Sequence, residues 1–117
     1  MNDRAKPAQD PQDLEPLLVS SQRAGDVEGM VVLYESGAVV DHGAGALAVG
    51  TAAIREVFAG MIATGRKFEF GDQQAAVVSG DLALTSTRLP DGTVTAEVAR
   101  RQSDGTWLWV IDRFSIV

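Results

Sequence analysis

The spacing of apolar residues predicts three helices in the first half of the chain. Asp13, Asp26 and Thr51 are typical N-caps, and Gly25 and Gly65 provide the left-handed conformation that often ends a helix. Apolar stripes at helical spacing follow the three caps: Leu14, Leu17 and Leu18 with Ser21, then Val27, Met30, Val31 and Tyr34, then Ile54, Val57, Phe58, Met61 and Ile62.

The pattern becomes strand-like from Lys67 onward, where Phe68 and Phe70 alternate with charged residues. Turn signals at 79–81, 90–92 and 103–105 separate runs that are rich in valine, threonine, leucine or tryptophan. This predicts an antiparallel meander of four long strands. A further short strand is expected over residues 38–41, at an edge of the sheet, followed by a glycine- and alanine-rich loop up to Gly50. Helices first and strands after indicate an α+β protein, with helices packed on one face of a curved sheet.

Composition and charge narrow the classes of function. The 117 residues suit one domain, which we place at 13–117 behind a flexible N-terminal arm at 1–12. A net charge of −6 argues against binding to nucleic acid or to an anionic membrane. The chain has no cysteine and one histidine, so we expect no disulfide, no thiolate nucleophile, no metal site and no cofactor. No apolar run is long enough to span a membrane and no signal-peptide pattern is present, so we expect a cytoplasmic protein.

The only histidine, His42, stands where the apolar run Val39–Val40 gives way to the small-residue loop. Imidazole is the side chain that titrates near neutrality, so a general base at the mouth of a pocket is one interpretation. A loop histidine in water is the other. The sequence alone leaves both open.

The hairpin turns predict which side chains share a face of the sheet. If the glycines at 92 and 105 end two-residue loops, Glu97 lies opposite Asp112 and also opposite Ser86. One face then carries a polar group of Ser86, Arg88, Glu97 and Asp112 among apolar residues that include Val110 and Phe114. The other face carries Trp107 and Trp109, which we expect to form a homodimer interface.

Several segments resemble one known superfamily. "RAGDVEGMVVLYESGAVVD", the small-residue loop, "GTAAIREVFAG" and the closing "WLWVIDRFSIV" are similar to nuclear transport factor 2 (NTF2)-like proteins, in the SnoaL-like and ketosteroid isomerase-like branch. The likeness covers Asp13 to Val117. It implies a cone-shaped, cystatin-like α+β barrel, in which three N-terminal helices and a curved antiparallel sheet enclose an apolar pocket, and it implies dimerisation through the outer sheet face.

The resemblance also suggests roles for residues. His42 aligns with the general-base aspartate of the isomerases, and Glu97 aligns with an acidic residue of their oxyanion hole. "IDRF", which contains Asp112, resembles the strand end that carries a catalytic aspartate in related epoxide hydrolases. The isomerase tyrosine that donates to the oxyanion falls near Leu18, which has no donor.

Two functions follow as expectations. The first is an enzyme of the isomerase, cyclase or lyase type that acts on a small hydrophobic molecule, with His42 as base and Glu97 or Asp112 as a protonated partner. Tyr34, Ser86, Arg88, Val110 and Phe114 would line its pocket. The second is a ligand-binding or dimerisation domain without catalysis, in which Arg88 neutralises Glu97 and Asp112 in a structural network.

Overall fold

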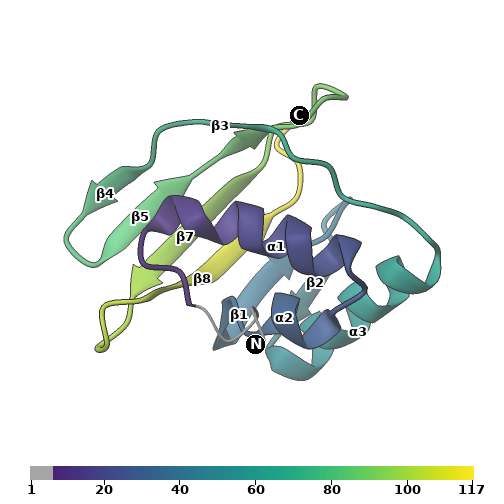
Figure 1. Cartoon of the computed structure of the whole chain (residues 1–117), viewed down its shortest axis with the longest axis horizontal. Coiled ribbons are helices and arrows are strands. Elements are labelled where there is room, and N and C mark those ends of the chain that lie inside the picture. The colour runs from purple at the N-terminus through teal and green to yellow at the C-terminus, as the bar shows by residue number, and fades with distance from the viewer. Residues whose placement is uncertain (1–6) are drawn as a thin grey trace.

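The computed structural model describes residues 7–117, in which helices cover one side of a curved sheet (Figure 1). The helical elements are η2 (Pro11–Asp13), α1 (Leu14–Arg23), α2 (Val27–Val31) and α3 (Thr51–Ala63). The strands are β1 (Tyr34–Asp41), β2 (Leu47–Val49), β3 (Asp72–Gln73), β4 (Val77–Ser79), β5 (Leu82–Thr85), β6 (Thr87–Arg88), β7 (Ala96–Arg101) and β8 (Trp107–Arg113). The predicted α+β class is confirmed, and the sheet does not close into a complete barrel.

The main sheet has the strand order β2-β1-β8-β7-β5-β4. Strands β4, β5, β7 and β8 form the predicted antiparallel meander, although β4 and β5 are short. The strand predicted over 38–41 does not lie at the edge, because β1 pairs in parallel with β8 and antiparallel with β2. The loop predicted up to Gly50 is therefore wrong in its second half, where Leu47–Val49 forms the edge strand.

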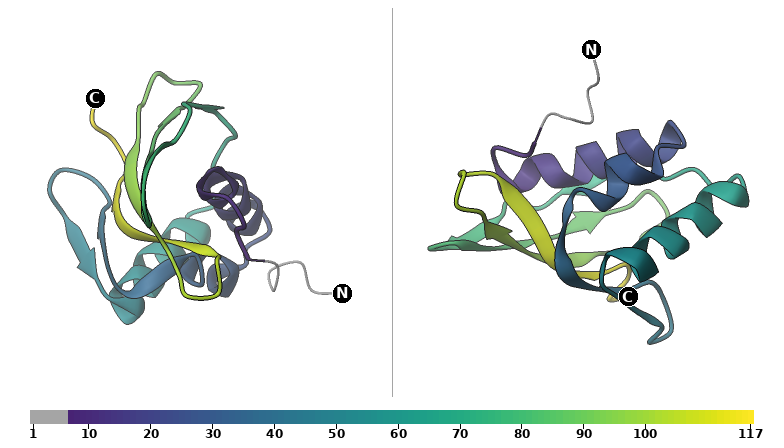
Figure 2. Two further views of the ribbon diagram at one scale, coloured as in Figure 1. Left: turned by 90° about the vertical axis from the view of Figure 1, so that its left-hand side faces the viewer. Right: turned by 90° about the horizontal axis from the view of Figure 1, so that it is seen from below.

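Helix α1 lies on the concave side of the sheet (Figure 2). The second helix is shorter than predicted and ends at Val31, so that Tyr34 begins β1 instead of closing the helix. The backbone enters the sheet at this point, where the Trp109 N–H donates to the Leu33 carbonyl over 2.8 Å. The third helix begins at Thr51, but its N-cap residue is Gly50.

Both predicted hairpin registers are shifted by one residue, because each loop has three residues instead of two. In the last hairpin the Gln102 N–H donates to the Thr106 carbonyl over 2.7 Å, and Gly105 has a φ of 85°. A three-residue loop closed by a left-handed glycine is the next most common hairpin connection after the two-residue loop. The shift pairs Ala99 with Trp109, where we had predicted Val110.

A β-bulge then cancels this shift along β8. The register changes between Val98 and Ala99, which leaves Val110 as the extra residue, and Glu97 pairs with Asp112 as predicted. The preceding hairpin has no such bulge. There Thr85 is the residue opposite Glu97, so the prediction of Ser86 at this place was wrong.

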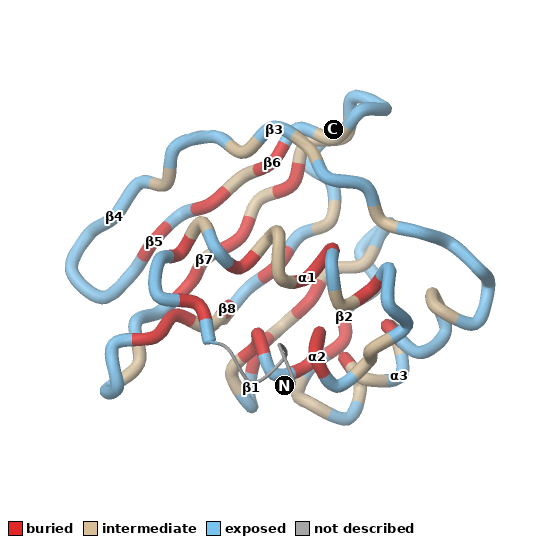
Figure 3. Tube along the Cα trace, in the orientation of Figure 1, coloured by how far each residue is buried: buried red, intermediate tan, exposed pale blue. Residues whose placement is uncertain are grey.

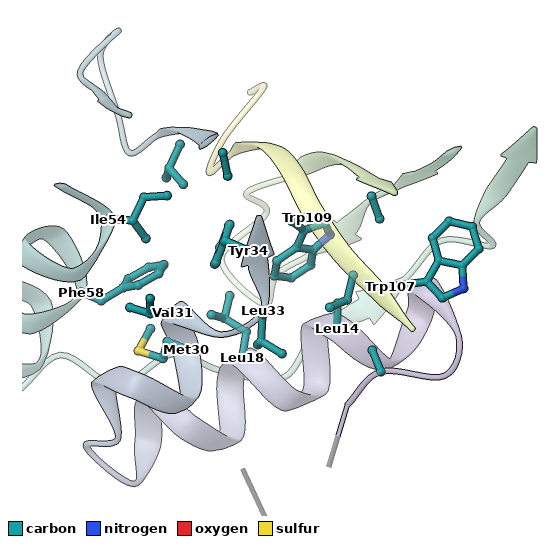
Figure 4. Packing of buried hydrophobic residues seen from close by; sticks show 14 of the residues in the cluster. Leu14, Leu18, Met30, Val31, Leu33, Tyr34, Ile54, Phe58, Trp107 and Trp109 are labelled. Carbon is teal, nitrogen blue, oxygen red and sulfur yellow. The ribbon is translucent and has the colours of Figure 1, made fainter. Parts of the chain in front are cut away.

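The corrected register moves both tryptophans into the core of a single chain. Trp109 is 1% exposed and Trp107 is 6% exposed, so the predicted interface built on these two residues is wrong. Trp109 lies beside the Tyr34 ring, with centroids 5.4 Å apart, and Phe58 contacts the other side of Tyr34 at 5.7 Å (Figure 4). The core thus lies between the helices and the concave face of the sheet.

Part of the predicted N-terminal arm belongs to the packed domain. Residues 1–6 lie outside the described part of the chain. Ala8 is 1% exposed and pairs with Trp107 in an isolated bridge, and the Asp10 side chain caps the turn Pro11–Asp13. The arm predicted at 1–12 is therefore wrong for its second half.

The outer face of the sheet carries apolar residues that stay exposed. Buried and more exposed positions alternate along the strands (Figure 3). One set of directly paired residues crosses all six strands of the main sheet, and we call it the apolar row: Val49, Val39, Ile111, Val98, Leu84 and Val77. Four of its members are at least half exposed.

Candidate functional site

A cavity of about 370 Å³ lies between α1 and the ends of β7 and β8. Its buried end carries three acidic side chains, Glu15 from α1, Glu97 from β7 and Asp112 from β8. Its mouth is formed by loop segments at 42–43, 66–69 and 89–93. Acids at the buried end of a partly apolar cavity are a common source of acid–base chemistry, because burial disfavours their charged form.

Glu97 and Asp112 lie side by side on neighbouring strands, and each is 3% exposed. The Tyr34 hydroxyl donates to Asp112 Oδ2 over 2.5 Å. The Thr85 hydroxyl donates to Glu97 Oε1 over 2.6 Å, and the Trp109 indole N–H in turn donates to Thr85 Oγ1 over 3.3 Å. One hydrogen bond therefore holds the Asp112 carboxyl, and a chain of two holds the Glu97 carboxyl.

Within residues 7–117, no basic side chain forms an ion pair with Glu97 or Asp112. Burial raises the pKa of Asp112 well above its usual value, and the Glu97 carboxyl raises it further. Burial also raises the pKa of Glu97, although the hydrogen bond from Thr85 opposes this rise. Burial, and then Asp112, raise the pKa of Tyr34, so its hydroxyl remains a donor at neutral pH. These directions favour a protonated carboxyl at the buried end of the cavity.

Glu15 is a third acid of the cavity that the sequence reasoning missed. Burial, and secondly the Glu97 charge, raise its pKa from 4.5 to about 7. The apolar stripe predicted for this helix centred on the leucines and placed Glu15 to one side. In the structure the buried arc of α1 also includes Val19 and Gln22. Since successive helical residues are about 100° apart, the centre of this arc lies roughly 80° from the centre of the predicted stripe, on the side of Glu15.

Gln22 shows which side of α1 this arc occupies. Its side chain is 1% exposed, accepts a hydrogen bond from the Phe68 N–H over 2.8 Å and donates to the Arg66 carbonyl over 2.6 Å. This buried glutamine lies seven residues, about two turns, beyond Glu15 and on the same side of the helix. The polar pair Glu15 and Gln22 marks the side of α1 that faces the loop 66–69.

His42 lies at the mouth of the same cavity. It directly follows β1, and its backbone N–H donates to the Ala46 carbonyl over 3.0 Å, which closes the turn before β2. Gly43 and Gly45 adopt positive φ angles in this turn, as the small-residue sequence allows. The structure therefore brings His42, Glu97 and Asp112 to one cavity, while their roles stay a prediction.

No family model and no curated protein sequence matches this chain. Solved structures do match its shape. A protein of unknown function with a cystatin-like fold from Nostoc punctiforme PCC 73102 superposes with a TM-score of 0.69 and 18% identity, over 87% of this chain and 84% of the other. An NTF2-like protein with a cystatin-like fold from Novosphingobium aromaticivorans gives 0.61 and 20%, over 86% and 75%.

A ketosteroid isomerase-like protein from Erwinia carotovora atroseptica gives a TM-score of 0.65 and 15% identity, over 87% of this chain and 89% of the other. The chain has the NTF2-like, cystatin-like fold. The resemblance inferred from the sequence is thereby confirmed at the level of the fold. Because function in such widely used folds is set by the site, the activity must be argued from the cavity.

Of the remaining predicted pocket residues, the structure places only Phe114 in the lining of the cavity. Phe114 lines the cavity, and Tyr34 lies behind it as the partner of Asp112. Ser86 and Arg88 do not line it, because the one-residue shift places Thr85 and Thr87 on the inner face. Val110, the bulge residue, does not line it either.

Arg88 is consequently not the neutralising partner that we had expected. Its side chain is exposed, and its backbone belongs to the small β3–β6 ladder opposite Asp72. Ser86 directs its hydroxyl to the Thr95 carbonyl over 2.7 Å. The two buried acids of β7 and β8 therefore rely on hydroxyl groups instead of a guanidinium.

Within residues 7–117, no helix has the length and apolar character needed to cross a membrane.

Proposed function

We propose that the cavity binds a small, largely hydrophobic molecule and transfers a proton to or from it without a cofactor. The observation that supports this proposal is the pair of buried carboxyl groups, Glu97 and Asp112, which border one cavity with His42 at its mouth. A protonated carboxyl in such a place donates a hydrogen bond to a ligand oxygen and stabilises negative charge that develops there. His42 serves as the base.

The walls of the cavity suit such a ligand. Phe68 and Phe114 meet edge to face, with ring centroids 6.5 Å apart, and both line the cavity together with Leu18. Small-molecule sites are typically apolar cavities with a few placed polar groups, and volumes of this size are common among them.

Exchange of carbon-bound protons provides a direct test. Small cyclic ketones such as cyclohexanone and 2-tetralone are incubated with the protein in D₂O, and loss of their α-proton signals is followed by NMR. We expect exchange above the buffer rate, loss of that excess in the variant His42→Ala, and an unfolding curve for this variant close to that of the wild type. Exchange that is unchanged in His42→Ala would remove the histidine from the reaction.

A binding or assembly domain without catalysis is the second candidate. It is favoured by the hydrogen bonds that already occupy one oxygen of Asp112 and one of Glu97, as in a structural network. Saturable ketone binding without any excess exchange would support this second function. In that case Asp112→Ala, which leaves the buried Tyr34 hydroxyl without its acceptor, would mainly change stability, by about 1–3 kcal/mol.

The outer sheet face supports a homodimer in either case. The apolar row crosses six strands, and four of its six residues are at least half exposed, as is typical of surfaces that bind another protein. A second copy of the chain is the partner that we propose for it.

A further inference from the structure

The three acids at the inner end of the cavity, Glu15, Glu97 and Asp112, differ in what already holds them. Asp112 accepts a hydrogen bond from Tyr34, and Glu97 accepts one from Thr85. No hydrogen bond or ion pair joins the Glu15 carboxyl to any other described residue. Among these three acids, Glu15 is therefore the one that is free to contact a ligand.

The basic side chains that border the cavity do not compensate Glu15. Lys67 donates its ammonium to the Arg23 carbonyl over 3.1 Å, outside the cavity. Arg66 stacks its guanidinium on the Phe68 ring, 5.6 Å from the centroid. Both side chains are exposed at the mouth, as are the acids Glu69 and Asp91.

Glu15 is half-buried, and an acid in such a place without a partner carries a desolvation cost whenever it ionises. A cation placed beside it removes this cost, and the aromatic walls formed by Phe68 and Phe114 provide both apolar contact and π faces for an organic cation. No cluster of three or more metal-ligating side chains occurs among the residues that the structure describes. These observations favour an organic cation over a metal ion.

We propose that Glu15 determines the charge of the ligand, and that the cavity takes a small primary amine with an apolar body whose ammonium group pairs with the Glu15 carboxylate. This inference rests on the proposed function, in that it needs the cavity to be a ligand site. It adds a residue that neither the sequence reasoning nor the fold assigns, and it names the class of ligand.

Three probes of similar shape separate the effect of charge from that of shape: 2-phenylethylamine, 2-phenylethanol and 3-phenylpropanoate. Their binding is measured by NMR titration at pH 6 and pH 8, with the signals of Phe68 and Phe114 as reporters of the cavity. We expect the amine to bind more tightly than the alcohol at pH 8, and the carboxylate to bind least.

The pH dependence has a defined sign. With a Glu15 pKa of about 7, the ionised fraction rises from about 0.09 at pH 6 to about 0.9 at pH 8, so the affinity for the amine should rise about tenfold. His42 also borders the mouth of the cavity. The variant Glu15→Gln separates the two groups, because it keeps His42 and should lose both the preference for the amine and most of the tenfold rise.

Glu56→Gln is the matched control, since Glu56 is an exposed residue of α3 that does not line the cavity. It makes the same change in net charge and should bind the amine as the wild type does. Equal affinity for amine and alcohol, or amine affinity that falls between pH 6 and pH 8, would overturn the inference while leaving the cavity as a ligand site. Failure of all three probes to perturb Phe68 and Phe114 would count against the proposed function as well.

Discussion

Replacing Glu15 by glutamine should stabilise the protein, and it should do so much more at pH 8 than at pH 5. The folded protein raises the pKa of this carboxyl from 4.5 to about 7. An acid with a raised folded-state pKa contributes its full stability below the unfolded value and loses it as the pH rises through the folded value. Glutamine keeps the shape of the neutral acid and cannot ionise, so it avoids that loss.

The structure gives the size of the effect. The interval between 4.5 and about 7, at 1.36 kcal/mol per pKa unit, corresponds to about 3 kcal/mol of unfolding free energy at pH 8. The same two pKa values give about 1 kcal/mol at pH 5, where the Glu15 carboxyl is already mostly ionised in the unfolded chain and still protonated in the folded protein. Burial is the main cause of the rise and the Glu97 charge is the second.

Urea unfolding followed by tryptophan fluorescence at pH 5 and pH 8 measures this difference. With a urea slope of roughly 1–3 kcal/mol/M for a small domain, the midpoint of Glu15→Gln should rise by roughly 1–3 M at pH 8. Glu56→Gln makes the same change in charge on an exposed helix position and should move little at either pH. A gain in Glu15→Gln that is the same at both pH values, or a loss at pH 8, would refute the reasoning from burial.

Two further variants test the network and the outer face. Tyr34→Phe removes the hydroxyl that donates to Asp112, so it should lower the unfolding free energy by about 1–3 kcal/mol, measured by the same urea curves; an unchanged midpoint would mean that this hydrogen bond contributes nothing net. Ile111→Lys places a charge in the middle of the apolar row, so light scattering at micromolar concentration should report a monomer where the wild type is a dimer; a monomeric wild type would remove the proposed interface.

The sequence was sufficient for the fold because its strongest signals are periodic. The stripe at 54–62 sits on an observed helix, and three glycine turns separate the four strands of the observed meander. The edge strand Leu47–Val49 gave no such signal. It consists of three residues within a run of glycine and alanine, and only its pairing with β1 makes it a strand.

The face of α1 was misjudged for a related reason. Leucine spacing identifies the most hydrophobic side of a helix, whereas the buried side also depends on what the rest of the chain places against it. Here the loop 66–69 packs over Gln22 and satisfies its amide, and the cavity beside that loop takes Glu15. Polar residues in a buried arc are invisible to a search for apolar stripes.

The predicted pairing of Glu97 with Asp112 is observed because two departures from the assumed hairpin cancel. A three-residue turn moves every pair near the loop by one position, and the bulge at Val110 restores the register before Asp112 is reached. The other hairpin has the same kind of turn without a bulge, so its inner face carries Thr85, and the predicted Ser86 is displaced. Side chains of a strand alternate between the two faces of the sheet, so one added residue moves every later side chain to the opposite face. Because Val110 is an extra residue in β8, Trp107 and Trp109 point into the core and Asp112 also lies on that inner face, where its carboxyl borders the cavity.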